Sequence, residues 1–103
     1  MSEIISLKML TGEEIVTELT GVQENLSTGE LLFYNVRRPH VLQFQPMGHG
    51  QLGLAFVPWA LSNPDIEHIE IPASSVIAKF SPADKVEKQY LQQTSSIEIA
   101  SHI

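Results

Sequence analysis

Four histidines offer the most versatile side-chain chemistry in this sequence of 103 residues, which contains no cysteine. Histidine binds metals beside other ligands and acts as a general base beside a nucleophile. No two of the four have the i, i+4 spacing of ligands on one helical face, and the lack of cysteine excludes thiolate metal sites. His68 and Glu70 would share one face of a strand as the start of a two-ligand site. A solvated polar face is the simpler interpretation of that pair.

Motifs of catalysis are also missing from the sequence. A Ser–His–Asp triad needs no fixed spacing, but no G-x-S-x-G turn is present to favour one. The glycine-rich segment 48–53 lacks the lysine and the following helix of a phosphate loop, and is better explained as a hairpin turn. The adjacent Glu13 and Glu14 would point to opposite faces of a strand or both to solvent, so they do not form an acid–base pair. We therefore expect no enzyme, no catalytic residues, no metal and no cofactor.

The segment 33–40 combines an aromatic ring, two guanidinium groups and an imidazole, and is the best candidate for binding. Arg37 and Arg38 can hold phosphate through charge-assisted hydrogen bonds, Tyr34 can stack on an unpaired base, and His40 adds positive charge when protonated. The alternative is that the arginines are ordinary surface residues beside a core strand. The candidate site for single-stranded RNA consists of Tyr34, Arg37, Arg38 and His40.

Charge is unevenly distributed along the chain, whose net charge is −6. Residues 1–30 carry six acids and one lysine, whereas residues 31–64 carry the two arginines and no acid. Residues 65–103 carry six acids and three lysines. A negative net charge opposes non-specific attraction to a phosphate backbone. Only the middle third therefore offers an anion a favourable surface.

The length favours a single domain with a thin core. No apolar run approaches the roughly 20 residues that span a membrane, and the first residues lack the basic and then apolar pattern of a signal peptide. We expect one domain in the cytoplasm, without contact to a membrane.

Apolar residues recur at every second position over much of the chain, which is typical of half-buried strands. In the first hairpin, Ile5, Leu7 and Met9 share one face, and Gly12 permits the turn. Pro39 lacks a backbone N–H and is expected to interrupt the strand pattern. Strands that do not alternate with helices predict a small barrel or sandwich. The expected strands are 4–10, 15–19, 31–36, 41–45, 52–61, 66–71 and 76–80.

One short C-terminal helix is expected after the last strand. Ser81 is suited to the N-cap, Pro82 to the first helical position, and Asp84 lies three residues after the cap. Residues 94–103 carry only a weak pattern. The apolar stripe at helical spacing consists of Val86, Tyr90 and Leu91.

Two short motifs resemble those of the Sm-like (Lsm) family. Gly12, Ile15 and Leu19 fit the spacing G-x-x-[apolar]-x-x-x-L of the first family motif, and residues 71–76 resemble the second, I-R-G-x-x-V. The likeness covers roughly residues 4–80 and is greatest to short phage-encoded Sm-like proteins. It implies a mainly β fold, with a strongly bent antiparallel barrel over 1–80 and a helix and tail over 81–103 in the same domain.

The resemblance also implies a non-enzymatic module that forms a homo-oligomeric ring of roughly five to seven chains and binds single-stranded RNA. If the chain is phage-encoded, the cytoplasm is that of a bacterial host. The RNA-contacting arginine and glycine of the family fall on Pro72 and Ala73, and the segment 23–29 has no counterpart of the Asp-x-x-Met-Asn motif. Any RNA site is therefore non-standard. The alternative function is a structural or assembly module that binds protein partners without nucleic acid.

Overall fold

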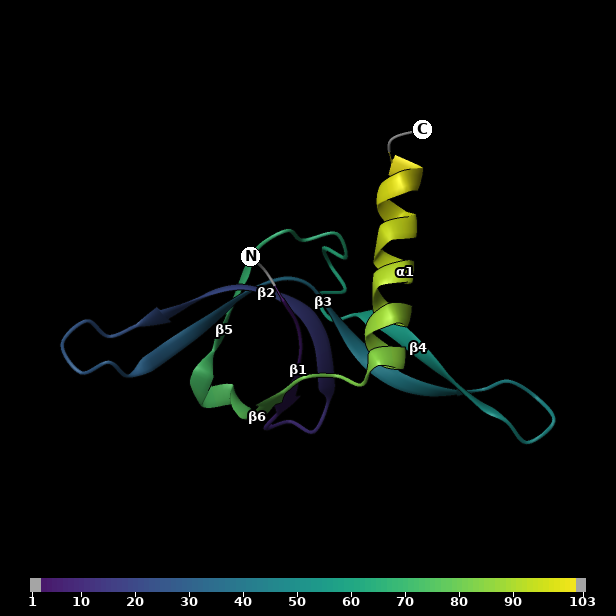
Figure 1. Ribbon diagram of the computed structural model, residues 1–103, viewed down its shortest axis with the longest axis horizontal. Helices are drawn as coiled ribbons and strands as arrows, with labels where there is room; N and C mark the ends of the chain where they lie inside the picture. Colours follow the sequence, from purple (N-terminus) through teal and green to yellow (C-terminus); the bar gives the residue numbers. More distant parts are fainter. Residues whose placement is uncertain (1–2, 102–103) are drawn as a thin grey trace.

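The chain forms a six-stranded antiparallel sheet and one C-terminal helix in a computed structural model, which describes residues 3–101, with side chains through residue 94 (Figure 1). The sheet order is β4-β3-β2-β1-β6, and β5 pairs with β3 outside this path. The elements are β1 (Glu3–Met9), β2 (Glu14–Glu24), β3 (Leu31–Pro46), β4 (Leu52–Pro58), β5 (Ile69–Pro72), the 3₁₀ turn η1 (Ala73–Ser75), β6 (Val76–Phe80) and α1 (Asp84–Ser101).

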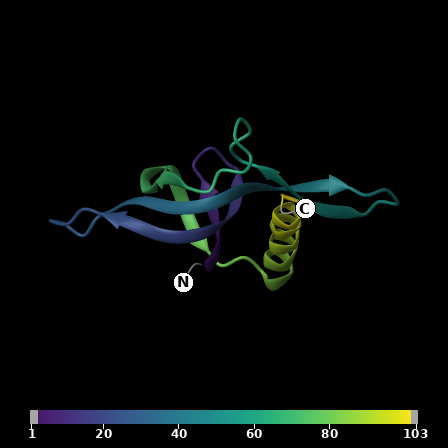
Figure 2. The same cartoon turned by 90° about the horizontal axis from the view of Figure 1, so that it is seen from above.

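The long strand β3 organises the sheet because it pairs with three other strands. Its first half lies between β2 and β5, and its second half pairs with β4. The β2–β3 and β3–β4 hairpins project from opposite ends of the molecule, which is 55 Å along its longest axis (Figures 1 and 2). β3 is thus the continuous element between two arms.

The mainly β prediction is confirmed, but the predicted closed barrel is wrong. β6 pairs with β1 and β5 pairs with β3, and among residues 3–101 no ladder joins β5 to β6. The two strands are four and five residues long and are separated only by η1, which turns the chain from one to the other. The sheet therefore curls without closing, and each of these strands keeps one side without a strand partner in the described chain.

The main core lies on one face of the curled sheet, and its pattern on β1 was predicted correctly. Ile5, Leu7 and Met9 are buried on one face of β1, as their alternation indicated. Trp59 and Tyr34 pack against this cluster from its rim. The cluster as a whole consists of Ile5, Leu7, Met9, Ile15, Leu19, Val36 and Ile71.

A second, smaller cluster lies on the opposite face of the sheet, beneath α1. Tyr90 of α1 packs against Val16 of β2 and Phe56 of β4, and the Phe56 and Tyr90 rings meet edge to face at 5.9 Å. Val86 supports the cluster from the first turns of α1. The predicted stripe is wrong at Leu91, which is 42% exposed, because the helix faces the sheet through every fourth residue. Its third inward position is the buried Thr94.

The helix also begins and ends later than the sequence suggested. Ala83 occupies the capping position, since its carbonyl accepts the first helical hydrogen bond from the N–H of Glu87. Within the described chain, no side-chain hydrogen bond is formed by Ser81, the predicted cap. α1 extends to Ser101, through much of the weakly patterned segment.

Most predicted strand boundaries differ from the observed ones: β1 and β2 each begin one residue earlier than expected, and β2 runs to Glu24 rather than residue 19. Pro39 does not interrupt the sheet, because β3 bends and continues through it to Pro46. β4 ends at Pro58 rather than residue 61. β5 begins at Ile69 because Ile66 uses its backbone groups elsewhere: its N–H donates to Asn63, and its carbonyl accepts from a residue of β3.

Replacement of Tyr90 by alanine should strongly destabilise the fold. Tyr90 is 2% exposed, and loss of a buried aromatic ring typically costs about 3–5 kcal/mol of unfolding free energy. Leu91→Ala on the same helix is the matched control and should cost less than about 1 kcal/mol. Urea denaturation measures both values. Equal losses would show that Tyr90 is not what anchors α1.

Candidate functional site

The candidate binding residues lie at a kink in β3. Arg38 has a positive φ of 50°, a left-handed conformation that is uncommon for any residue other than glycine. The register between β2 and β3 shifts beside it, between Val16 and Glu18. The backbone N–H of Arg38 reaches the carbonyl of Ile66 at 3.3 Å, and the carbonyl of Pro39 accepts from Trp59 at 2.9 Å. The kink therefore draws the 59–68 loop onto β3.

The Arg38 carbonyl at this kink accepts two hydrogen bonds from buried rings. The hydroxyl of Tyr90 donates to it at 2.9 Å, and Nδ1 of His40 lies 2.7 Å away. Since a carbonyl can only accept, His40 carries its proton on Nδ1 in this contact. The neighbouring carbonyl of Arg37 accepts from Thr17 at 2.6 Å. These contacts hold the left-handed backbone in place and tie α1 to it.

Both arginine side chains converge on one carboxylate in the 59–68 loop. Arg37 donates to Oε2 of Glu67 from Nε at 2.9 Å and from Nη2 at 2.5 Å. Arg38 donates from Nη2 to Oε1 at 3.0 Å. Glu18 of β2 lies 3.5 Å from Arg37, so two acids accompany two bases. The structure brings the predicted arginines together but against acids, and the cluster carries no net charge.

The electrostatics of this cluster reflect mutual neutralisation. Hydrogen bonds from Arg37, and then from Arg38, lower the pKa of Glu67 below its usual range. The pKa of Arg37 is raised, chiefly by its hydrogen bond to Glu67. Because Glu67 is more than half exposed, solvent screens the ion pairs and limits what they contribute to stability. Their evident effect is to orient the loop and the two guanidinium groups.

The two ring residues of the candidate site are not free at the surface. His40 is buried at 2% exposure, and burial lowers its pKa, so it supplies no surface charge near neutral pH. Tyr34 is half-buried in β3, between Val22 of β2 and Ile71 of β5, and packs against the main core. Of the four candidate residues, only Arg37 and Arg38 carry a charged side chain near neutral pH, and both are bonded to Glu67.

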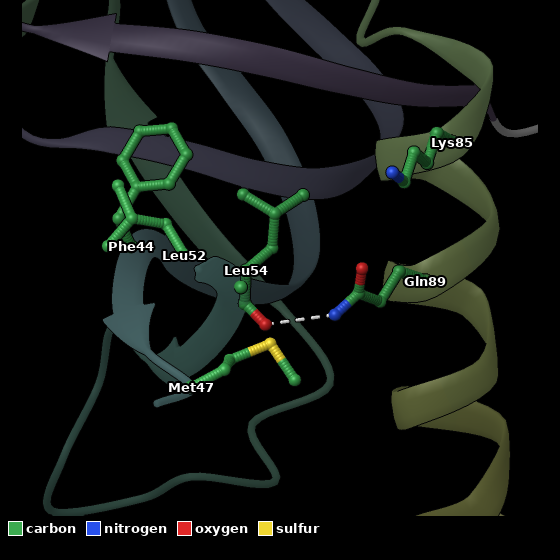
Figure 3. Close-up of a pocket in the computed structure, with 7 residues that line it drawn as sticks. Phe44, Met47, Leu52, Leu54, Lys85 and Gln89 are labelled. Atoms are coloured by element: carbon green, nitrogen blue, oxygen red, sulfur yellow. Dashed lines mark hydrogen bonds between the residues drawn. The ribbon is translucent and has the colours of Figure 1, made fainter. Parts of the chain in front are cut away.

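Exposed apolar side chains gather at two other places. Four of the five residues of β6 are exposed, including Ile77 and Phe80. Phe44, Met47 and Leu52 are exposed on the β3–β4 arm, and with Gly53, Leu54, Lys85 and Gln89 they line a groove of about 480 Å³ between the arm and α1 (Figure 3). Contiguous exposed apolar surfaces are typical of places where proteins contact other molecules.

The polar pair noted in the sequence remains a two-residue contact. His68 Nε2 and Glu70 Oε1 are 3.8 Å apart, and both side chains are largely exposed. The described part of the chain contains no group of three histidine, aspartate or glutamate residues arranged to hold a metal ion. Nor does any helix within residues 3–101 have both the length and the apolar character needed to cross a membrane.

Comparison with protein-family models finds no match, and a search of curated proteins finds no relative.

The sequence did not reveal the residues that pair with the two arginines or that join α1 to β4. Glu67 lies 30 residues from Arg37, and no local pattern indicated that it pairs with both arginines. Gln89 and Gln93 of α1 were equally unmarked, yet their side-chain amides donate to the carbonyls of Leu54 and Phe56 at 2.9 Å each. Their i, i+4 spacing was the one available signal, since it places both on one helical face.

Stability should fall as the pH is lowered through the range in which His40 protonates in the unfolded chain. Burial lowers its folded pKa below the ordinary value of 6.5, so the unfolded state binds more protons below that pH. His40→Asn, which keeps a donor but cannot titrate there, should flatten this slope, which is at most about 1.4 kcal/mol per pH unit. Urea denaturation at several values between about pH 5 and pH 8 measures how the unfolding free energy depends on pH.

The control for this experiment is His49→Asn in the β3–β4 turn, which is expected to follow the wild-type pH profile. Wild-type and His40→Asn proteins with parallel profiles would contradict a buried, neutral His40.

Proposed function

We propose that the chain is a non-enzymatic assembly module that forms a homo-oligomeric ring through the edges of β5 and β6. The observation that carries the proposal is the state of the sheet edges. β5 and β6 each pair on one side only within the described chain, whereas the outer edge of β4 is met by two glutamines of α1. Unpaired strand edges are templates for pairing with another chain unless they are blocked.

The composition of β6 supports this use of its edge. Its sequence is Val-Ile-Ala-Lys-Phe, so Lys79 is the one charged residue that opposes edge pairing. Ile77 is 61% exposed and Phe80 is 43% exposed. A strand so poorly covered by its own chain gains from burial against a neighbour, at roughly 25 cal/mol per Å² of apolar surface.

Two different edges favour a closed ring over a simple dimer. When β5 of one copy meets β6 of the next, the contact is head to tail, and repeated rotation closes it into a ring. The resemblance to Sm-like proteins suggests about five to seven chains. Two observations support this resemblance. Gly12 of the first motif lies in the turn between β1 and β2 with a φ of 104°, and the second motif spans β5, η1 and the start of β6.

Ile77→Lys should disrupt the ring, because it places a second charge on a five-residue edge strand. Multi-angle light scattering should show the oligomer mass falling toward that of the 11.4 kDa monomer. Leu61→Lys is the matched control: Leu61 is 76% exposed but lies in the 59–68 loop, so its variant should keep the wild-type mass. A wild-type protein that is monomeric at micromolar concentration would refute the ring.

A second candidate function is binding of single-stranded RNA, and one observation favours it. Arg37 and Arg38 already hold the two oxygens of a carboxylate, which is the geometry in which guanidinium groups also bind phosphate. Glu67 occupies that position in the free chain. A phosphate group would have to displace it, which makes the expected binding weak.

Glu67→Gln should therefore strengthen RNA binding, because it removes the competing negative charge while keeping a side chain of the same size. Fluorescence anisotropy with a single-stranded RNA should show tighter binding at low salt and a steep loss as salt is raised. The control is Glu67→Gln combined with Arg37→Ala and Arg38→Ala, which should not bind. Absence of binding by both wild type and Glu67→Gln at low salt would reject the RNA candidate.

A further inference from the structure

β4 has an outer edge that would be a third strand-pairing surface if α1 did not cover it. Ladder pairing places Leu54 and Phe56 opposite Phe44 and Leu42 of β3. The carbonyls of Leu54 and Phe56 point away from β3, since they accept hydrogen bonds from α1 instead. In a strand, the N–H of a residue points to the same side as its carbonyl. These two residues therefore present the hydrogen-bonding groups that an added strand would use.

Two glutamines of α1 occupy this edge. Nε2 of Gln89 donates to the Leu54 carbonyl, and Nε2 of Gln93 donates to the Phe56 carbonyl, each at 2.9 Å (the first bond is drawn in Figure 3). Four residues of helix rise about 6.0 Å, and two residues of strand advance about 6.8 Å. The i, i+4 amides on the helix therefore match the i, i+2 carbonyls on the strand.

The core beneath α1 keeps the two amides in register. Tyr90 lies between the glutamines in sequence, is buried against Phe56, and donates its hydroxyl to the Arg38 carbonyl. Thr94 follows Gln93 and donates to the Tyr90 carbonyl within the helix. The glutamines thus extend from a fixed part of α1, so little backbone entropy remains to be lost when their side chains bind the strand.

The surroundings of this edge would promote association if it opened. Phe44, Met47 and Leu52 are each about 70% exposed around it. The segment from Val41 to Leu54 carries no Asp, Glu, Lys or Arg to repel a second copy. Apolar strands with free edges and no charge are the usual sites of uncontrolled pairing.

We propose that Gln89 and Gln93 seal the outer edge of β4 against pairing with β4 of a second copy, and so confine self-association to β5 and β6. The last clause rests on the ring proposed above, but the sealed edge does not. Two exposed β4 edges would pair antiparallel about a two-fold axis, because each presents the same surface. Such pairing would link one ring to another.

The test is the double substitution Gln89→Ala and Gln93→Ala, measured by light scattering across a range of protein concentrations. Alanine favours the helix more than glutamine does, so α1 should be retained. Circular dichroism at about 222 nm measures the helix content of the variant. We expect at least a doubling of the wild-type mass, growing with concentration. Lys88→Ala, an exposed position on the same helix, is the control and should leave the mass unchanged.

A third substitution identifies the edge itself. Leu54→Pro removes an N–H that points away from β3, as Pro58 already does at the end of β4. Added to the alanine pair, it should restore the wild-type mass. An unchanged mass in the alanine pair would overturn the sealed edge, and so would a larger mass that Leu54→Pro does not reverse. A monomeric wild type would refute the ring alone, since the alanine pair would still be expected to dimerise.

Discussion

The left-handed backbone at Arg38 is the constraint on which the rest of the structure depends. It bends β3 so that one strand serves β2 and β5 with its first half and β4 with its second. A left-handed residue with a side chain is held only where its surroundings over-determine it. Tyr90 from α1 and His40 from β3 meet the Arg38 carbonyl, and the 59–68 loop meets its N–H. Distant parts of the chain therefore fold against a single peptide group.

The same kink changes the role of the two arginines. In sequence, Arg37 and Arg38 stand out as the sole charged residues of the middle third. In the fold, their guanidinium groups position Glu67, and through it the loop that joins β4 to β5. An arginine pair that orients a loop needs an acidic partner, and this chain supplies two within 4 Å. The two arginines are therefore accounted for by contacts within the fold.

The alternation of apolar residues predicted correctly those features of the fold that depend only on neighbouring residues in the sequence. The alternation of Ile5, Leu7 and Met9 identified the inner face of β1, and the bounds of β6 were predicted without error. Features that depend on contacts across the chain were missed. Pro39 marked a bend that tertiary contacts turned into a continuous strand, and closure of the sheet depends on a ladder between β5 and β6 that no local pattern controls. The glutamines of α1 resembled an ordinary solvated face because their acceptors lie 35 and 37 residues earlier.

The two apolar clusters lie on opposite faces of one sheet, with Ile15 in one and Val16 in the other. α1 contributes only to the second, so it can detach without exposing the main core. Opening of such a segment breaks the contacts of Tyr90 with Phe56 and the Arg38 carbonyl, and a sub-global opening of this kind requires less free energy than global unfolding. The time that β4 spends uncovered is then governed by this local equilibrium and not by the melting of the domain. Exchange rates of the backbone amide hydrogens of α1 would measure this opening equilibrium directly, while the rest of the protein stays folded.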